Sequence, residues 1–378
     1  MKKILALLLV LALSLTLVAC GSGKKDAAST GSYKVAMVTD YGDITDQSFN
    51  QTTWEAVVAF GKDNNVETKY YKPTSNDTAG RVASVELAIA EGYNVIVMPG
   101  YAFGGTIVEV APNYPDVKFV ALDVAKGDLL ETAVANKGES YDYNPDNWKL
   151  EDYVDMSNVY CAIYQEELAG YMAGYAAVKL GYTKLGFLGG MAVPAVIRYG
   201  YGYVQGVDAA AKELNEKVEM NYSWQYGANF NASPELQTMA AGWYQTGTEV
   251  IFACGGSMFA SISAAAAAEE GKVVGVDVDQ SGESTTVITS AMKGLADSAQ
   301  WALGKFYAGE FASIGGVQTS LGANENAVGL PTATWSLTKW SVDSYKVMLQ
   351  DIKDGKIAID NNYDNLASTE NVTLNIVG

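Results

Sequence analysis

Histidine is absent from this chain of 378 residues. Its absence excludes Ser-His-Asp and Cys-His catalysis, imidazole metal ligands and histidine proton shuttles. A hydrolase would need clustered metal-binding aspartates or a histidine acid, and the sequence shows neither. We therefore expect a protein that is not an enzyme and that uses no metal or other cofactor.

Cysteine is scarce, with only Cys20, Cys161 and Cys254 in the chain. Cys161 and Cys254 lie in apolar runs and are typical of buried strand residues. A disulfide between them is compatible with an oxidising compartment, but nothing in the sequence implies one.

Positive charge is also scarce. The chain has 25 Lys and Arg against 43 Asp and Glu, for a net charge of −18. This excess argues against nucleic acid and against an anionic lipid surface as partners. Motifs for dinucleotides and for P-loop phosphate binding are missing too, because Gly200, Gly202 and Gly206 lack the required spacing.

What is present begins with a signal at the N-terminus. Two lysines precede an apolar run over 4–18, and Leu17-Val18-Ala19-Cys20 matches a lipobox. The run is too short to read as a membrane span. We predict a lipoprotein signal peptide over 1–19 and a lipid on Cys20, which anchors the protein to the outer face of the cell membrane. The alternative is an ordinary secretory peptide with a chance cysteine.

The next segment, 20–32, is rich in Gly, Ser, Ala and Lys and has no apolar periodicity. We predict a flexible tether there.

From Tyr33 onward, short apolar strands alternate with helical segments. The first strands are expected over 34–39, 66–71, 95–99 and 118–123, and the pattern restarts with strands over 158–164, 184–188, 250–253 and 273–277. Strands without polar alternation, separated by helices, indicate parallel sheets covered on both faces. We predict an α/β protein of two doubly wound lobes, with ligand-binding loops after the strands.

The segment 126–156 interrupts this pattern. It is polar, rich in aromatics and without clear periodicity. We expect an inserted excursion with one short helix, packed by its own aromatic side chains.

Residues able to bind a ligand follow the strands. The loop over 40–51 ends where a helix begins, and backbone N–H groups at a helix start bind polar groups. Phe49 in this loop is typical of an aromatic that stacks on a flat ligand. The alternative is that Ser48 caps the helix and Phe49 packs inward. Asp123 and Asp277 end apolar strands, where carboxylates point into the crevice and can bind ligand hydroxyls.

Five motifs occur in order along the chain. They are Asp46-Gln47-Ser48-Phe49-Asn50-Gln51, the stretch 164–174, the glycine-containing stretch 189–206, Gly275-Val276-Asp277-Val278-Asp279-Gln280 and Thr289-Ser290-Ala291-Met292-Lys293. Together they resemble the basic membrane protein family, whose members are substrate-binding lipoproteins of ABC importers, of purine nucleoside receptor type, with a type I periplasmic-binding-protein fold.

The resemblance implies two lobes joined by three crossovers. The first lobe would comprise 33–164 and 283–320, and the second 165–282 and 330–378. The crossovers would fall near 164–167, near 278–282 and between 315 and 334. Lys293 would then belong to the first lobe.

The resemblance also implies the site. A base would lie between Phe49 and Tyr199, with Asp46 and Asn50 facing it. Asp123 would bind base nitrogens, Asp277 would accept from ribose hydroxyls and Lys293 would donate to the sugar. Gly255 would let the backbone approach the ribose.

We accordingly expect a monomer that captures a nucleoside by lobe closure and delivers it to an ABC permease and its ATPase. Alternatives with the same fold are a protein that binds a sugar or a flavin-like ligand, and a sensor that presents its ligand to a membrane receptor. A surface nucleoside hydrolase is disfavoured by the missing histidine.

Overall fold

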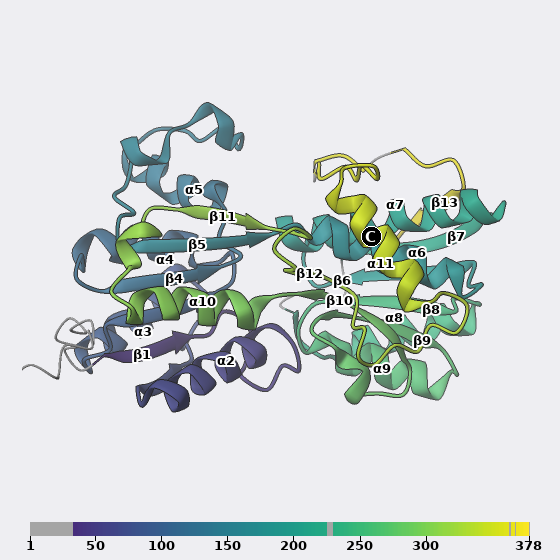
Figure 1. Ribbon diagram of the computed structural model, residues 1–378, viewed down its shortest axis with the longest axis horizontal. Helices are drawn as coiled ribbons and strands as arrows, with labels where there is room; N and C mark the ends of the chain where they lie inside the picture. Colours follow the sequence, from purple (N-terminus) through teal and green to yellow (C-terminus); the bar gives the residue numbers. More distant parts are fainter. Residues whose placement is uncertain (1–32, 225–229, 363, 367, 378) are drawn as a thin grey trace, which may run out of the picture. The chain divides into compact units, whose positions relative to one another are not determined.

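The computed structural model describes residues 33–224, 230–362, 364–366 and 368–377 (Figure 1). The predicted signal peptide, the predicted lipid attachment site Cys20 and the predicted tether lie outside these residues. Among the helices that are described, none is long and apolar enough to cross a membrane.

The first sheet has six parallel strands in the order β11-β5-β4-β3-β1-β2. Alternate residues of its strands enter different cores: Val35 and Met37 pack on one face, and Ala36 and Val38 on the other. This two-sided burial explains the continuous apolar runs. The strands are β1 (Lys34–Val38), β2 (Glu67–Tyr71), β3 (Val95–Pro99), β4 (Lys118–Leu122), β5 (Val159–Tyr164) and β11 (Gln318–Leu321).

Helices cover both faces of this sheet. Two pack together on one face, and three neighbours form the other layer. The pair is α2 (Phe49–Asn64) and α10 (Leu295–Tyr307), and the three are α3 (Thr78–Ala90), α4 (Phe103–Val110) and α5 (Lys126–Asn136). We call this sheet with its helices the first lobe.

The second sheet has seven strands in the order β12-β10-β9-β8-β6-β7-β13, all parallel except β12. Together with its helices it forms the second lobe. The strands are β6 (Lys184–Gly189), β7 (Val218–Ser223), β8 (Val250–Cys254), β9 (Lys272–Asp277), β10 (Val287–Lys293), β12 (Val328–Gly329) and β13 (Val372–Ile376). The helices are α6 (Glu166–Lys179), α7 (Pro194–Leu214), α8 (Pro234–Gln245), α9 (Met258–Ala268) and α11 (Val342–Lys353).

Three segments pass between the lobes. The chain leaves the first sheet after β5, returns to the first lobe between β10 and α10, and leaves it again between β11 and β12. In Figure 1 the green strand β10 runs from the second sheet toward α10. The second passage lies at Gly294, and here the prediction of a crossover near 278–282 is wrong. β10 pairs with β9 along the second sheet, so Lys293 belongs to the second lobe.

Helices α6 and α7 approach until their backbones touch. A Cβ atom added at Gly206 would lie 1.9 Å from the carbonyl oxygen of Tyr171, and one added at Gly202 would lie 2.1 Å from that of Glu167. Gly170 and Gly174 make equally close approaches from α6. These glycines lie four residues apart on each helix and therefore share one face. The close approach sets the positions of the first turns of both helices.

The segment 126–156 is only partly an excursion. Its first residues form α5, whose Leu129 and Leu130 are buried against the first lobe. The following residues contain two 3-10 turns, η2 (Pro145–Asn147) and η3 (Leu150–Asp152), and aromatic side chains that pack edge to face. Tyr141 packs on Trp148, and Trp148 packs on Tyr153.

Cys161 and Cys254 are both free and buried, in β5 and β8 respectively. The prediction of buried strand cysteines is confirmed.

Candidate functional site

A cavity lies where the loops that follow the strands of both lobes meet. It contains about 800 Å³ of empty space, a volume that includes space open to solvent. All eight predicted binding residues line it: Asp46, Phe49, Asn50, Asp123, Tyr199, Gly255, Asp277 and Lys293. Whether they bind a ligand stays a prediction.

The first wall is the loop before α2. The Asp46 carboxylate accepts hydrogen bonds from the backbone N–H groups of Ser48, Asn50 and Gln51 at 2.9–3.0 Å. It also accepts one from the Asn50 side chain, which donates to Asp40 as well. Asp46 thus closes the helix start, and the Asp46–Asn50 pair holds the loop together. Burial raises the pKa of Asp46, and these hydrogen bonds oppose that shift.

At the end of this loop, Ser48 does not cap helix α2, although the alternative interpretation required it. Ser48 makes no side-chain bond to its own helix. Its hydroxyl instead donates to Asp277 Oδ2 in the second lobe, at 2.7 Å. Phe49 is half-buried on the cavity wall.

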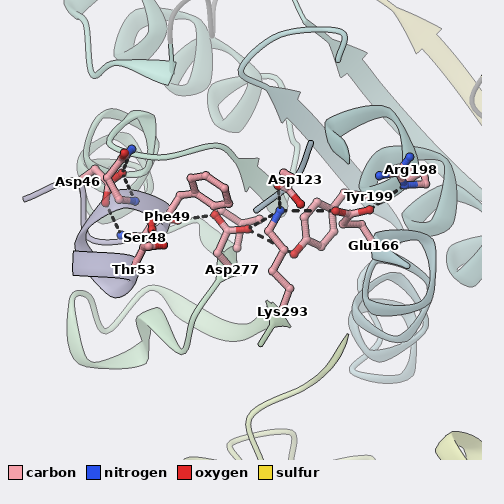
Figure 2. A network of polar contacts seen from close by, with 12 residues as sticks. Asp46, Ser48, Phe49, Thr53, Asp123, Glu166, Arg198, Tyr199, Asp277 and Lys293 are labelled. Atoms are coloured by element: carbon pink, nitrogen blue, oxygen red, sulfur yellow. Dashed lines mark hydrogen bonds and ion pairs between the residues drawn. The ribbon is translucent and has the colours of Figure 1, made fainter. Parts of the chain in front are cut away.

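Lys293 lies at the centre of the site (Figure 2). Its ammonium contacts Asp123 directly and lies 3.5 Å from Glu166 Oε1 and 3.6 Å from Asp277 Oδ1. Although burial opposes the charge, these three carboxylates raise the pKa of Lys293, which remains protonated. Burial, aided by repulsion from Glu166, raises the pKa of Asp123 to about 7 against the attraction of Lys293.

A second cation extends this network. Arg198, in the first turn of α7, donates through Nε to Glu166 Oε2 at 2.7 Å and lies 4.0 Å from Glu167 Oε2. Glu166 and Glu167 begin α6 and are buried. Burial, with repulsion from Glu166, raises the pKa of Glu167 to about 7.

Asp123 and Asp277 also share an unusual backbone. Both follow or end strands with positive φ, 60° and 66° respectively. Side chains other than glycine seldom adopt this conformation, which costs of order 1–3 kcal/mol and clusters at functional sites. The strained turns aim both carboxylates at Lys293.

The arrangement of the aromatic rings differs from the prediction. Tyr199 is only 2% exposed and packs edge-on against Phe252. The Lys293 ammonium lies 4.9 Å from the Phe49 ring centre and 5.5 Å from that of Tyr199. A cation therefore occupies the place between the rings where we expected a base.

Like Glu166 and Arg198, Phe230 is a site residue that the sequence analysis did not predict. It follows β7, is half-buried and lines the cavity from the second lobe. A Cβ atom at Gly255 would lie 2.6 Å from its ring, so Gly255, with φ of 149°, makes room for Phe230. The signal was a phenylalanine followed by asparagine in a polar segment after a strand, which both Phe230-Asn231 and Phe49-Asn50 share.

Comparison with known proteins assigns this architecture. Residues 33–363 match the Bmp family, described as ABC transporter substrate-binding proteins that are PnrA-like. The chain belongs to the Bmp family. This Bmp-family chain is 28% identical to the ABC transporter nucleoside-binding protein BmpA of Lactococcus lactis subsp. cremoris, with 95% of the chain and 99% of the relative covered. It is 26% identical to basic membrane protein B of Borreliella burgdorferi, with 84% and 86% covered.

The fold of this Bmp-family protein also matches a solved structure. A solute-binding protein of an ABC transporter system from Aeropyrum pernix superimposes with a TM-score of 0.69 at 22% identity, covering 88% of this chain and 95% of that one. The predicted type I periplasmic-binding-protein fold is confirmed. The family comprises substrate-binding proteins rather than enzymes, so a permease is the expected partner.

Proposed function

We propose that this Bmp-family protein captures a purine nucleoside in the cavity between its lobes and delivers it to an ABC permease. The observation that carries the proposal is the meeting, in one cavity, of aromatic rings from both lobes with carboxylates that can still accept hydrogen bonds. Phe49 and Phe230 offer flat faces for a base. Asp123 Oδ1 has no hydrogen-bond partner among the described residues. The Lactococcus relative, by its name, binds nucleosides.

The charges of the wall favour an uncharged ligand. Lys293 and Arg198 are its cations, and both already contact carboxylates. Asp40, Asp46 and Asp128 add further carboxyl groups to the same wall. A phosphate group would meet this negative potential without a free cation, so nucleotides should bind much more weakly than nucleosides.

Calorimetric titration tests the proposal. We expect the mature protein to bind at least one of adenosine, guanosine and inosine, and to bind AMP, ribose and riboflavin at least about 100-fold more weakly. Phe230→Ala should cost about 1–3 kcal/mol of binding free energy, as lost base stacking does. Asp277→Ala should cost about 1.5–3 kcal/mol, because it removes a charge-assisted acceptor.

Trp301→Ala is the matched control. Trp301 is 47% exposed on α10 and does not line the cavity. Full affinity in Phe230→Ala and Asp277→Ala would move the site elsewhere. Binding of riboflavin or a free sugar in preference to every nucleoside would replace the proposed ligand.

We also propose that the protein is held on the outer face of the cell membrane by lipid on Cys20. The lipobox Leu17-Val18-Ala19-Cys20 supports this. Cys20→Ala should leave unprocessed precursor or release soluble protein, which fractionation and mass spectrometry of the membrane and soluble fractions would detect. A variant that is processed and remains membrane-bound like the natural chain would contradict lipid attachment.

A further inference from the structure

The hydroxyl of Ser48 serves a purpose other than capping. Ser48 occupies the position before α2 where a serine normally accepts from its own helix, but Asp46 does that instead. Ser48 is fully buried, and its hydroxyl donates to Asp277 Oδ2 at 2.7 Å. Since α2 belongs to the first lobe and β9 to the second, this bond joins the lobes, as Figure 2 shows.

A second buried bond lies beside it. Gln280 is fully buried and fixed within the second lobe, because its Oε1 accepts from Val276 N at 2.9 Å and its own N–H donates to Ser290. Its Nε2 donates to the backbone carbonyl of Gln47 at 3.0 Å. Gln47 has a positive φ of 57°, which presents that carbonyl to the second lobe.

The two oxygens of the Asp277 carboxylate, which accepts the Ser48 hydrogen bond, differ in the quality of their hydrogen bonds. Ser48 holds Asp277 Oδ2 at normal distance, whereas Oδ1 has Tyr199 OH at 3.4 Å and Lys293 Nζ at 3.6 Å. Both of these distances exceed those of strong charge-assisted bonds. Asp277 is 6% exposed and lines the cavity, so Oδ1 can still accept from a ligand.

Closure over an empty cavity therefore leaves a buried carboxylate oxygen poorly satisfied, which is costly. A ligand hydroxyl that donates to Oδ1 removes this cost. It also leaves Oδ2 free to hold Ser48, so the ligand and the inter-lobe bond stabilise the same closed state.

We propose that Ser48 and Gln280 form an inter-lobe latch that a ligand hydroxyl sets by binding Asp277. Ser48 acts as a positioning residue, since it does not line the cavity. The inference rests on the proposed function for the ligand's ribose hydroxyls, and on the inter-lobe bonds for the latch itself.

Ser48→Ala tests the latch, because it removes the inter-lobe bond without removing a helix cap. We expect adenosine to bind about ten- to one-hundredfold more weakly. Most of this loss should come from a faster dissociation rate, which stopped-flow experiments measure. The melting temperature without ligand should stay close to that of the natural chain. Ser48→Thr keeps the hydroxyl and should restore affinity. The matched control is Ser84→Ala, which removes another buried hydroxyl of the first lobe that bonds only within its helix.

A ligand without ribose hydroxyls separates a latch from a structural role. For 2′,3′-dideoxyadenosine we expect no further loss in Ser48→Ala, because Asp277 receives no hydroxyl in either protein. Equal losses for adenosine and the dideoxy compound would overturn the coupling to Asp277.

Lobe closure is measured by fluorescence energy transfer between two dyes. They are attached to the cysteines introduced by Leu87→Cys in α3 and Leu214→Cys at the end of α7. Both positions are exposed. Saturating adenosine should produce a smaller closed population in Ser48→Ala than in its parent. If nucleosides bind and the two populations agree, the latch is wrong and the proposed function stands. If no nucleoside binds but Ser48→Ala lowers the closed population without ligand or with another ligand, the proposed function is wrong and the latch stands. No nucleoside binding together with equal populations overturns both.

Discussion

Lys293 is the cation that three buried carboxylates share at the centre of the site. Its ammonium lies beside carboxylates from the residue after β4, from the start of α6 and from the end of β9. Burying charges is expensive, and a buried ion pair is maintained only when each charge keeps its partners. This one side chain therefore connects the stability of the fold with the shape of the cavity.

Lys293→Met tests that role, since methionine keeps an unbranched apolar stem and removes the charge. Three carboxylates would be left buried with less compensation, and we expect the free energy of unfolding to fall by about 3–5 kcal/mol. Urea denaturation measures the change. Lys62→Met on the exposed side of α2 is the control and should change stability by less than about 0.5 kcal/mol. Equal denaturation midpoints for the two variants would contradict the central role of Lys293.

The helices α6 and α7 show how an element interface builds a site. Their glycines allow backbone contact, and the first turns then bring Glu166 within 2.7 Å of Arg198. Small residues at this spacing let two helices approach more closely than larger side chains allow. The packing of the two helices thus determines the geometry of charges at the cavity wall.

Gly206→Ala should force the helices apart, because the new Cβ atom would lie 1.9 Å from a backbone oxygen of Tyr171. We expect a loss of about 1–3 kcal/mol, typical of overpacking. The matched control is Gly242→Ala in α8, where an added Cβ atom meets nothing within 4 Å; helix propensity should make it stabilising by up to about 1 kcal/mol. Thermal or urea unfolding compares them, and a Gly206→Ala protein as stable as Gly242→Ala would refute the interpretation of the close contact.

For the molecule as a whole, negative charge is distributed between surface and cavity with opposite consequences. Exposed carboxylates such as Glu213 have a pKa lowered by a lysine partner. Buried Asp128 and Glu167 instead have pKa values raised by burial to about 7. Carboxylates of the first kind stabilise the fold above the ordinary carboxylate pKa. Those of the second kind lower the free energy of unfolding as the pH rises and they lose their protons.

We therefore expect the melting temperature without ligand to fall as the pH rises from about 5 to about 8. In this window the folded protein holds protons on Asp128 and Glu167 that the unfolded chain has already released, so stability falls by roughly a few kcal/mol. Circular dichroism melts measure the slope. Asp128→Asn keeps the acceptor for Ala125 N and should flatten it. A melting temperature that rises over this range, or an unchanged slope in Asp128→Asn, would contradict the assignment.

The sequence by itself determined the two-lobe α/β architecture and the position of the cavity. Apolar runs without alternation require burial on both faces, which only parallel sheets with two helix layers provide. Because the carboxyl ends of parallel strands meet at one edge of a sheet, Asp46 and Asp123 had to converge in the first lobe. That Asp277 of the second lobe meets them is what the family resemblance implied. Phe49 carried a local signal too, since an aromatic in a polar loop has few partners there.

Tertiary structure alone decided which sheet received β10, what occupies the space beside Tyr199 and where Phe230 lies. The connection 278–286 between β9 and β10 contains no α-helix, although parallel neighbours usually need a longer crossover, so a local pattern would not pair these strands. Tyr199 is positioned by packing against Phe252, and Lys293 by its contacts with Asp123 and Glu166. These partners are distant in sequence, and burial and charge balance between them depend on three-dimensional packing that no local pattern records.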